Sequence, residues 1–265
     1  MYLREVSGEI KVNLLFNKIQ TTKFILLVSF GIIFMTQTFA FFPNSNMQTP
    51  TASPIVPIKA KHHHEVIVLI HGLLRSYMSM KPLKLYLENQ GYQVYYYNYP
   101  SEKYTIHDHA VYLNEFIGRI LVNNSGVKIH FVTHSLGGII VREALSKWPS
   151  SQLKHIGSLI MLAPPNQGSL LAKVSTKMFP LITSSIKPLA ELSSEKRSYV
   201  HRVPVPNIKM GIIAGRFDAK VPPSAARLQG QADPVVVNST HTFIMNHSKT
   251  RKLIVTFLEK GSFEE

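Results

Sequence analysis

The sequence contains no cysteine among its 265 residues. Without cysteine the chain can form no disulfide, no thiolate zinc site and no cysteine nucleophile, and its redox compartment stays undetermined. Acidic residues are also scarce, because 15 Asp and Glu stand against 29 Lys and Arg, a formal net charge of +14. These basic residues form no dense run, so the pattern favours a solvated basic surface, and we expect no nucleic-acid partner.

The composition nevertheless predicts a folded chain. Hydrophobic residues make up 45% of it and charged residues only 17%, so we expect an apolar core and no wholesale disorder. Three adjacent histidines, residues 62–64, could chelate a metal. Adjacent imidazoles at the end of a linker are usually solvent-exposed and chelate only adventitiously, so we expect no metal site there.

The first 42 residues have the pattern of a targeting segment. Four cations lie within residues 1–23, and an apolar stretch, FILLVSFGIIFM, follows at 24–35. Thr38-Phe39-Ala40 resembles a signal-peptide cleavage site. If it is not cleaved, the uncharged stretch 24–42 is just long enough to anchor the chain in a bilayer. Either outcome predicts export: to the periplasm, to the medium, or to the outer face of the inner membrane.

Residues 43–61 hold four prolines among small polar residues, which is typical of an extended linker. One domain is therefore expected over residues 62–265. Short apolar runs alternate there with amphipathic stretches, which predicts a parallel sheet with helices on both faces. The segments that predict six strands are 66–70, 93–99, 128–133, 157–163, 209–214 and 235–237. Helices are expected near 79–89, from about residue 106, at 136–147 and near 243–259.

The strongest chemical signal is the sequence THSLGG at 133–138. A serine hydroxyl is a poor nucleophile unless a base removes its proton and the backbone exposes it to a carbonyl carbon. A sharp turn between strand and helix provides that exposure and requires small residues two positions on either side of the serine. Gly137 meets the requirement, whereas Thr133 departs from the usual glycine. Ser135 is therefore the candidate nucleophile.

Several segments together resemble a known superfamily. HGLLRS at 71–76, NYPS at 98–101, THSLGG at 133–138 and LAPPNQGS at 162–169 are similar to motifs of small bacterial esterases and lipases of the α/β-hydrolase superfamily. The resemblance spans residues 64–260. It implies an α/β-hydrolase fold with a minimal cap, and ester hydrolysis by a Ser-His-Asp triad without a metal or organic cofactor.

Triad members follow the superfamily order of serine, acid and histidine. His241 lies in a loop before the last predicted helix, whereas His247 is expected on that helix and at the surface, so we favour His241 as the base. Asp218 follows the strand 209–214, where the family places its acid, and it could orient the imidazole. Asp233 is the second candidate, although Asp-Pro commonly begins a turn. Glu143 is expected to face away from the reaction.

The resemblance also implies an oxyanion hole formed by backbone N–H groups of Leu73 and Leu136. Two preorganised donors of this kind stabilise the negative charge that develops on the carbonyl oxygen. We interpret His71 as structural and Gly72 as the residue that allows a tight loop. His134 is expected to be packed or hydrogen-bonded, with no catalytic role.

Residues 169–207 contain the apolar, mildly basic stretch LLAKVSTKMFPLI, which predicts either a small cap in contact with lipid or an ordinary packed helix. We expect a monomeric esterase or lipase acting on small-molecule or lipid esters, with membrane association through the N-terminal segment. The same triad would also serve a thioesterase, amidase or acyltransferase. A non-catalytic lipid-binding protein on this scaffold is the alternative of a different class.

Overall fold

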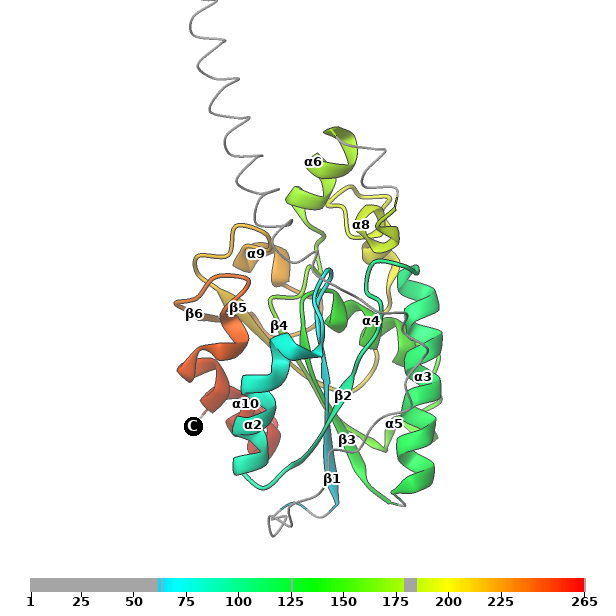
Figure 1. Cartoon of the computed structure of the whole chain (residues 1–265), viewed down its shortest axis with the longest axis vertical. Helices are drawn as coiled ribbons and strands as arrows, with labels where there is room; N and C mark the ends of the chain where they lie inside the picture. The colour runs from blue at the N-terminus through cyan, green and yellow to red at the C-terminus, as the bar shows by residue number, and fades with distance from the viewer. Residues whose placement is uncertain (1–61, 63, 125, 179–184, 265) are drawn as a thin grey trace, which may run out of the picture. The chain divides into compact units, whose positions relative to one another are not determined.

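The computed structural model describes residues 62, 64–124, 126–178 and 185–264 (Figure 1). The predicted targeting segment, 1–42, and the predicted linker, 43–61, lie outside the described residues. Within the described part of the chain, no helix is both long enough and apolar enough to cross a bilayer.

Six parallel strands form one sheet in the order β2-β1-β3-β4-β5-β6. Their bounds are β1 Glu65–Ile70, β2 Gln93–Tyr97, β3 Lys128–His134, β4 Ile156–Leu162, β5 Lys209–Gly215 and β6 Val235–Val237. The predicted strand count and the parallel arrangement are confirmed, with bounds that differ by one or two residues.

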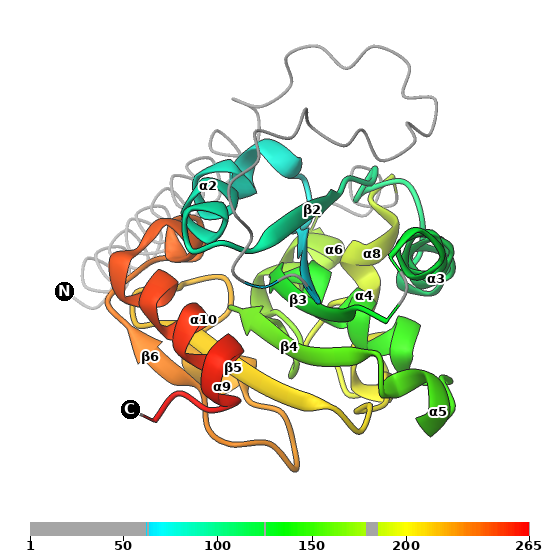
Figure 2. The same ribbon diagram turned by 90° about the horizontal axis from the view of Figure 1, so that it is seen from below.

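Helices cover both faces of this sheet, which is why its strands are continuous apolar runs (Figure 2). The long helices are α2 Lys81–Asn89, α3 Ile106–Asn123, α4 Leu136–Leu145 and α10 Ser248–Lys260. In β1, Val66 and Val68 pack into the core beneath α3 and α4. The alternate residue Ile67 packs beneath α2 and α10 on the opposite face.

Shorter helices connect these elements. They are η1 Tyr77–Met80, α5 Ser150–Leu153, α6 Leu170–Met178, α8 Lys187–Glu191, η2 Tyr199–Arg202, α9 Pro223–Ala226 and η3 Ile244–Asn246. The last predicted helix is therefore divided. His247 has an extended backbone, with φ −70° and ψ 132°, which ends η3 and places α10 after it.

The strand order predicts where a site can form. β1 is followed by α2 on one face of the sheet, whereas its neighbour β3 is followed by α4 on the other face. Chain segments that leave two adjacent parallel strands in opposite directions open a crevice at their carboxyl ends. Ile70 pairs with Thr133 in register, so the residues after both strands meet there.

Candidate active site

Ser135 occupies a strained turn between β3 and α4. Its φ of 53° and ψ of −120° lie in a region that side chains other than glycine rarely adopt. Ser135 is 8% exposed, and its N–H donates to the Leu162 carbonyl at 2.9 Å. Backbone strain of this kind persists only where the surrounding structure imposes it, and it clusters at functional sites.

The small residues that the turn needs are present for a steric reason. A Cβ at Gly137 would lie 2.9 Å from both Cγ2 and the carbonyl oxygen of Ile70, so no side chain fits there. Thr133, which stands where the usual motif has glycine, is fully buried, and its hydroxyl donates to the Ile160 carbonyl at 3.4 Å. The neighbouring strand β4 thus accommodates the departure from the motif.

The loop after β1 lies against this turn. A Cβ at Gly72 would be 3.0 Å from the Ser135 Cβ and 2.9 Å from the His134 Nδ1, which explains the glycine. Leu74 has a positive φ of 54°, and its N–H donates to the Ser101 Oγ at 2.9 Å. This bond pins the loop beside the turn.

The two amides predicted for the oxyanion hole are free to bind a ligand. Leu136 is the first residue of α4, where an N–H has no acceptor within its own helix. Among the described hydrogen bonds, neither the Leu73 N–H nor the Leu136 N–H has an acceptor. Leu73 directly follows Gly72, so both amides belong to the segments that meet at Ser135.

His71 has the structural role that the sequence indicates. Its Nδ1 lies 3.0 Å from the Gly72 carbonyl, and the Tyr99 hydroxyl donates to the His71 carbonyl at 2.8 Å. Burial lowers the pKa of His71 to about 4, so the imidazole is neutral near pH 7. A neutral ring packed on Tyr99 supports the loop and adds no charge to the site.

Asp218 and His241, the residues predicted to be the acid and the base, are in direct contact. The His241 Nδ1 lies 2.7 Å from the Asp218 Oδ2, and the Asp218 side chain is completely buried. Its other oxygen, Oδ1, accepts the backbone N–H groups of Lys220 and Val221 at 2.9 and 2.8 Å. The carboxylate is therefore fixed in place, and it leaves the His241 Nε2 free to act on another group.

The second candidates lie elsewhere. The Asp233 side chain is 75% exposed and pairs with Arg227 at 3.3 Å. His247 is half-buried and precedes α10, so its predicted position on the helix was wrong; the extended backbone at residue 247 is the reason. The Glu143 carboxylate accepts the Tyr199 hydroxyl at 2.8 Å and contacts His107 at 3.0 Å.

Ser135 and His241 are linked through His134, the residue that precedes Ser135 in the chain. The described hydrogen bonds include none between the Ser135 hydroxyl and the His241 imidazole. The His134 Nε2, however, lies 2.9 Å from the His241 carbonyl oxygen, and the two imidazole centroids are 4.8 Å apart. Catalytic hydrogen bonds are often long without substrate and tighten when it binds.

A second contact with the His241 loop was not foreseen. The Arg75 Nη2 donates to the Thr242 Oγ1 at 3.0 Å, which joins the loop after β1 to the loop after β6. Arg75 belongs to the HGLLRS segment, but nothing in that segment indicates which residue its side chain would reach. The 167 residues between the two partners make this contact a product of the tertiary fold.

The PPNQGS segment is structural at its centre. Asn166 accepts from the buried Arg142 Nη1 at 2.9 Å and donates to the Ala226 carbonyl at 2.8 Å. Burial lowers the pKa of Arg142 to about 10. The segment thus ties the loop after β4 to α4 and α9.

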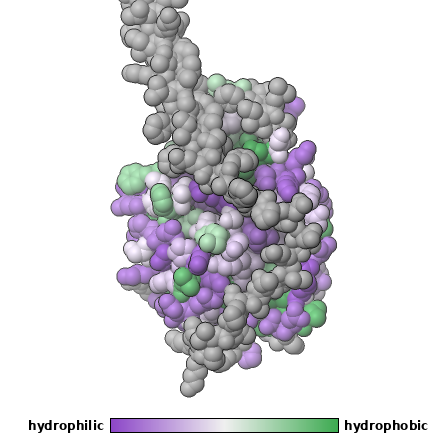
Figure 3. All heavy atoms as spheres, in the orientation of Figure 1, coloured by the Kyte–Doolittle hydropathy of each residue, from purple (hydrophilic) through white to green (hydrophobic). Residues whose placement is uncertain are grey.

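The segment 169–207, predicted to be a cap or a packed helix, contains α6, α8 and η2. α6 buries Ala172 but leaves Leu170 and Leu171 64% and 41% exposed. The space-filling view likewise shows hydrophobic residues scattered among hydrophilic ones on the visible face (Figure 3). α6 is therefore only partly packed, and its role as a cap stays a prediction.

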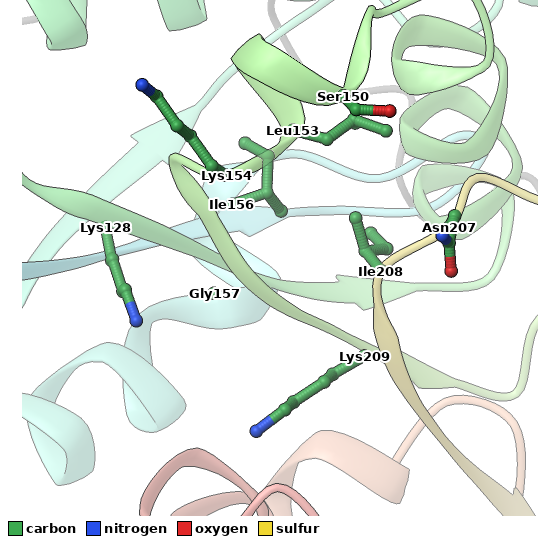
Figure 4. A pocket seen from close by; sticks show the side chains of 9 residues that line it. All are labelled: Lys128, Ser150, Leu153, Lys154, Ile156, Gly157, Asn207, Ile208 and Lys209. Atoms are coloured by element: carbon green, nitrogen blue, oxygen red, sulfur yellow. The ribbon is translucent and has the colours of Figure 1, made fainter.

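A hollow of about 350 Å³ lies at the opposite, amino-terminal edge of the sheet. Its lining includes Lys128, Lys154 and Lys209, whose ammonium groups point in different directions (Figure 4). None of the predicted site residues contributes to it. The hollow is therefore separate from the candidate active site.

Residues 59–183 match the family described as "Putative serine esterase (DUF676)". This range includes Ser135 and the loop after β1. No curated protein sequence matches the chain.

Solved structures with the same fold were also found. The mature lipase BlEst2 of Bacillus licheniformis is 18% identical, with a TM-score of 0.59 over 74% of this chain and 91% of that one. Lipase B of Aspergillus fumigatus is 17% identical, with a TM-score of 0.58 over 82% and 63%. MGS-MChE2, an alpha/beta hydrolase from lagoon sediments of Mar Chica, Morocco, is 19% identical, with a TM-score of 0.53 over 74% and 91%.

These likenesses establish the fold: the chain has the α/β-hydrolase fold predicted from its sequence. The family match over residues 59–183 supports an ester hydrolase.

Proposed function

We propose that the chain hydrolyses carboxylic esters by acyl transfer through Ser135, His241 and Asp218. One observation carries the proposal. The strained turn at Ser135 and the pair of His241 with buried Asp218 meet at one edge of the sheet through the contact between His134 and His241, although Ser135 and His241 are 106 residues apart in sequence. A nucleophile, a base and a group that orients the base are the parts that acyl transfer requires.

In the first half of the reaction, the Ser135 Oγ attacks the ester carbonyl carbon while its proton passes to the His241 Nε2. Asp218 accepts the His241 Nδ1–H, which fixes the tautomer and stabilises the imidazolium. The negative charge on the former carbonyl oxygen is bound by the N–H groups of Leu73 and Leu136. The ester C–O bond then breaks, and His241 returns the proton to the leaving alcohol.

In the second half, water attacks the acyl-enzyme. His241 takes a proton from that water, the bond between the Ser135 Oγ and the acyl carbon breaks, and the serine recovers its proton. The carboxylic acid leaves, and every group in the site is restored. No step needs a metal or an organic cofactor.

The decisive test is Ser135→Ala, measured with a short-chain p-nitrophenyl ester. We expect turnover to fall by at least about 10³-fold, because only binding and the oxyanion hole would remain. A fluorophosphonate probe should label the wild type on the peptide that contains Ser135 and should leave the variant unlabelled. Undiminished turnover in the variant would exclude this mechanism, and an unlabelled wild type would indicate a non-catalytic scaffold.

The substrate class is determined by assaying a panel of compounds. Esters, thioesters and amides with matched acyl chains would separate an esterase or lipase from a thioesterase or amidase that uses the same triad. We expect the oxyesters to have the highest kcat/KM. A thioester preference of tenfold or more would move the proposal to the thioesterases.

We further propose, from the sequence alone, that residues 24–42 direct export of the domain. N-terminal sequencing of the protein recovered from a bacterial envelope or medium would test this. A start near residue 41 supports a cleaved signal, and an uncleaved protein in the membrane fraction supports an anchor. Recovery of the intact chain in the cytosol would contradict export.

A further inference from the structure

His241 sits in a loop that makes few backbone hydrogen bonds. The described backbone–backbone bonds in this part of the chain run from Phe217 N–H to the Ser239 carbonyl and from Asn246 N–H to the Phe243 carbonyl. Between them lies a turn at residues 241–243, and no backbone–backbone bond of normal geometry is described for residues 240–242. A general base in such a loop must be held by side chains, because a displacement of about 1 Å can cost roughly 100-fold in rate.

Two side chains from the opposite side of the site supply that support. His134, at the end of β3, contacts the His241 carbonyl at 2.9 Å, and Arg75, after β1, donates to Thr242 at 3.0 Å. His134 is bonded covalently to the nucleophile, so its hydrogen bond links the backbone of Ser135 to the backbone of His241.

The His241 carbonyl, as the acceptor, determines which nitrogen of His134 carries the proton in this hydrogen bond. A carbonyl oxygen carries no proton, so the His134 Nε2 must be the donor, and in a neutral ring the Nδ1 is then bare. The Nδ1 has no hydrogen-bond partner among the described residues, and it lies 2.9 Å from the position that a Cβ on Gly72 would occupy. Burial, and secondarily the nearby His241, lower the pKa of His134 well below its usual value. The link is therefore a neutral Nε2–H tautomer at the pH of most esterase assays.

Neutrality matters because of the distance between the two rings. Their centroids lie 4.8 Å apart, and His241 becomes an imidazolium during acyl transfer. A second cation at this distance would oppose that charge, whereas a neutral imidazole holds the loop without opposing it.

We propose that His134 is a positioning residue that fixes the distance between Ser135 and His241 through the His241 carbonyl. The inference rests on the proposed function, since it assigns a role to a neighbour of that triad. His134 touches no reacting atom. Arg75 is the second anchor of the same loop.

The test compares His134→Leu, which removes the donor, with His134→Gln, whose amide N–H can occupy the position of the imidazole Nε2. We expect His134→Leu to lower kcat about 10- to 100-fold with KM changed less than threefold. His134→Gln should recover kcat to within about fivefold of the wild type.

The matched control is His130→Leu. His130 is also a buried histidine of β3, but its Nδ1 pairs with the Ser158 Oγ at 2.8 Å, away from the His241 loop. This variant should lose stability while keeping kcat within about twofold. If His134→Leu keeps kcat like the control, or if His134→Gln fails to restore it at equal thermal stability, the positioning role is overturned.

The two anchors can also be tested against each other. Because Arg75 and His134 hold adjacent residues of one loop, Arg75→Met combined with His134→Leu should lower kcat by a factor that differs from the product of the two single effects. Independent effects would contradict a shared function. Ser135→Ala, assayed in parallel, separates the hypotheses, because undiminished turnover in that variant would refute the proposed function and not the role of His134 alone.

Discussion

The two edges of the sheet differ in backbone strain and in exposure to solvent. At the carboxyl edge, Leu74, Ser135 and Ala163 follow β1, β3 and β4, and they are the three residues other than glycine with positive φ in the described chain. At the amino edge, Lys128 and Lys209 begin β3 and β5, and both are exposed. Strain and constrained polar groups gather where the chain brings Ser135 to His241, and ordinary solvated residues cover the other edge.

The buried histidines show the same contrast. Near the amino edge, His130 pairs with Ser158 and lies 3.7 Å from Glu65; burial lowers the pKa of His130, and the Glu65 carboxylate opposes that shift only in part. At the carboxyl edge, His71 and His134 contact backbone carbonyls and no carboxylate. A buried imidazole without an acidic partner stays neutral, so the candidate site holds its loops with hydrogen bonds and adds no competing charge.

Among the variants at the two edges, Asp218→Asn should cause the largest loss of ester turnover. An amide at this position favours the wrong tautomer of His241, so we expect kcat for p-nitrophenyl butyrate to fall about 10⁴-fold. Asp233→Asn, an exposed carboxylate before Pro234, is the control and should stay within twofold of the wild type. Comparable losses in both variants would contradict the assignment of the acid.

Gly137→Ala should have the next largest effect, on both stability and turnover. Its Cβ would lie 2.9 Å from the Ile70 carbonyl oxygen, so we expect about 1–3 kcal/mol of lost stability together with lost turnover. Gly118→Ala is the control, because no atom lies within 4 Å of the added Cβ and the glycine is inside α3. It should gain about 0.5–1 kcal/mol in urea unfolding. Equal stability of the two variants would refute the conclusion that a side chain at position 137 clashes with Ile70.

Acid should destabilise the fold through its buried histidines. Burial lowers the pKa of both His71 and His109 to about 4, from 6.5 in an exposed histidine. The unfolded chain binds these protons first, so the contribution is full above pH 6.5 and is lost as the pH falls from 6.5 towards 4.

Each such histidine contributes a slope of about 1.4 kcal/mol per pH unit in that window. His109→Leu should therefore lower the slope of unfolding free energy against pH by about that amount. The measurement is urea unfolding at several pH values between 4 and 7. An unchanged slope in His109→Leu would show that this imidazole is not held neutral by the fold.

The smallest effect is expected at the amino edge. Replacing Lys128, Lys154 and Lys209 together by Gln should change ester kcat/KM less than twofold, because their hollow is separate from the site. A larger change for an uncharged ester would show that the two edges are coupled. Assaying a negatively charged ester beside the uncharged one would show whether these lysines attract substrate over a long range.

The sequence alone predicted the strands well, and it pointed to candidate site residues, because both depend on local patterns. The run VIVLI predicts a strand buried on both faces, and THSLGG has the small residues that a strand-to-helix turn requires. Asp218 and His241 follow strands in a parallel sheet, so their approach to each other could be expected. Whether they serve catalysis stays a prediction that the variants above address.

Other features depend on contacts that no local pattern encodes. The break before α10 at His247, the pairing of Arg142 with Asn166, and the reach of Arg75 to Thr242 all join residues from separate segments. The hydrogen bond from His134 to His241 spans 107 residues. The amino-acid order determined which strands form and which residues could react, since apolar periodicity and turn chemistry act over a few residues. Only the tertiary structure decided which side chains hold the His241 loop, because that depends on where distant loops meet above the sheet.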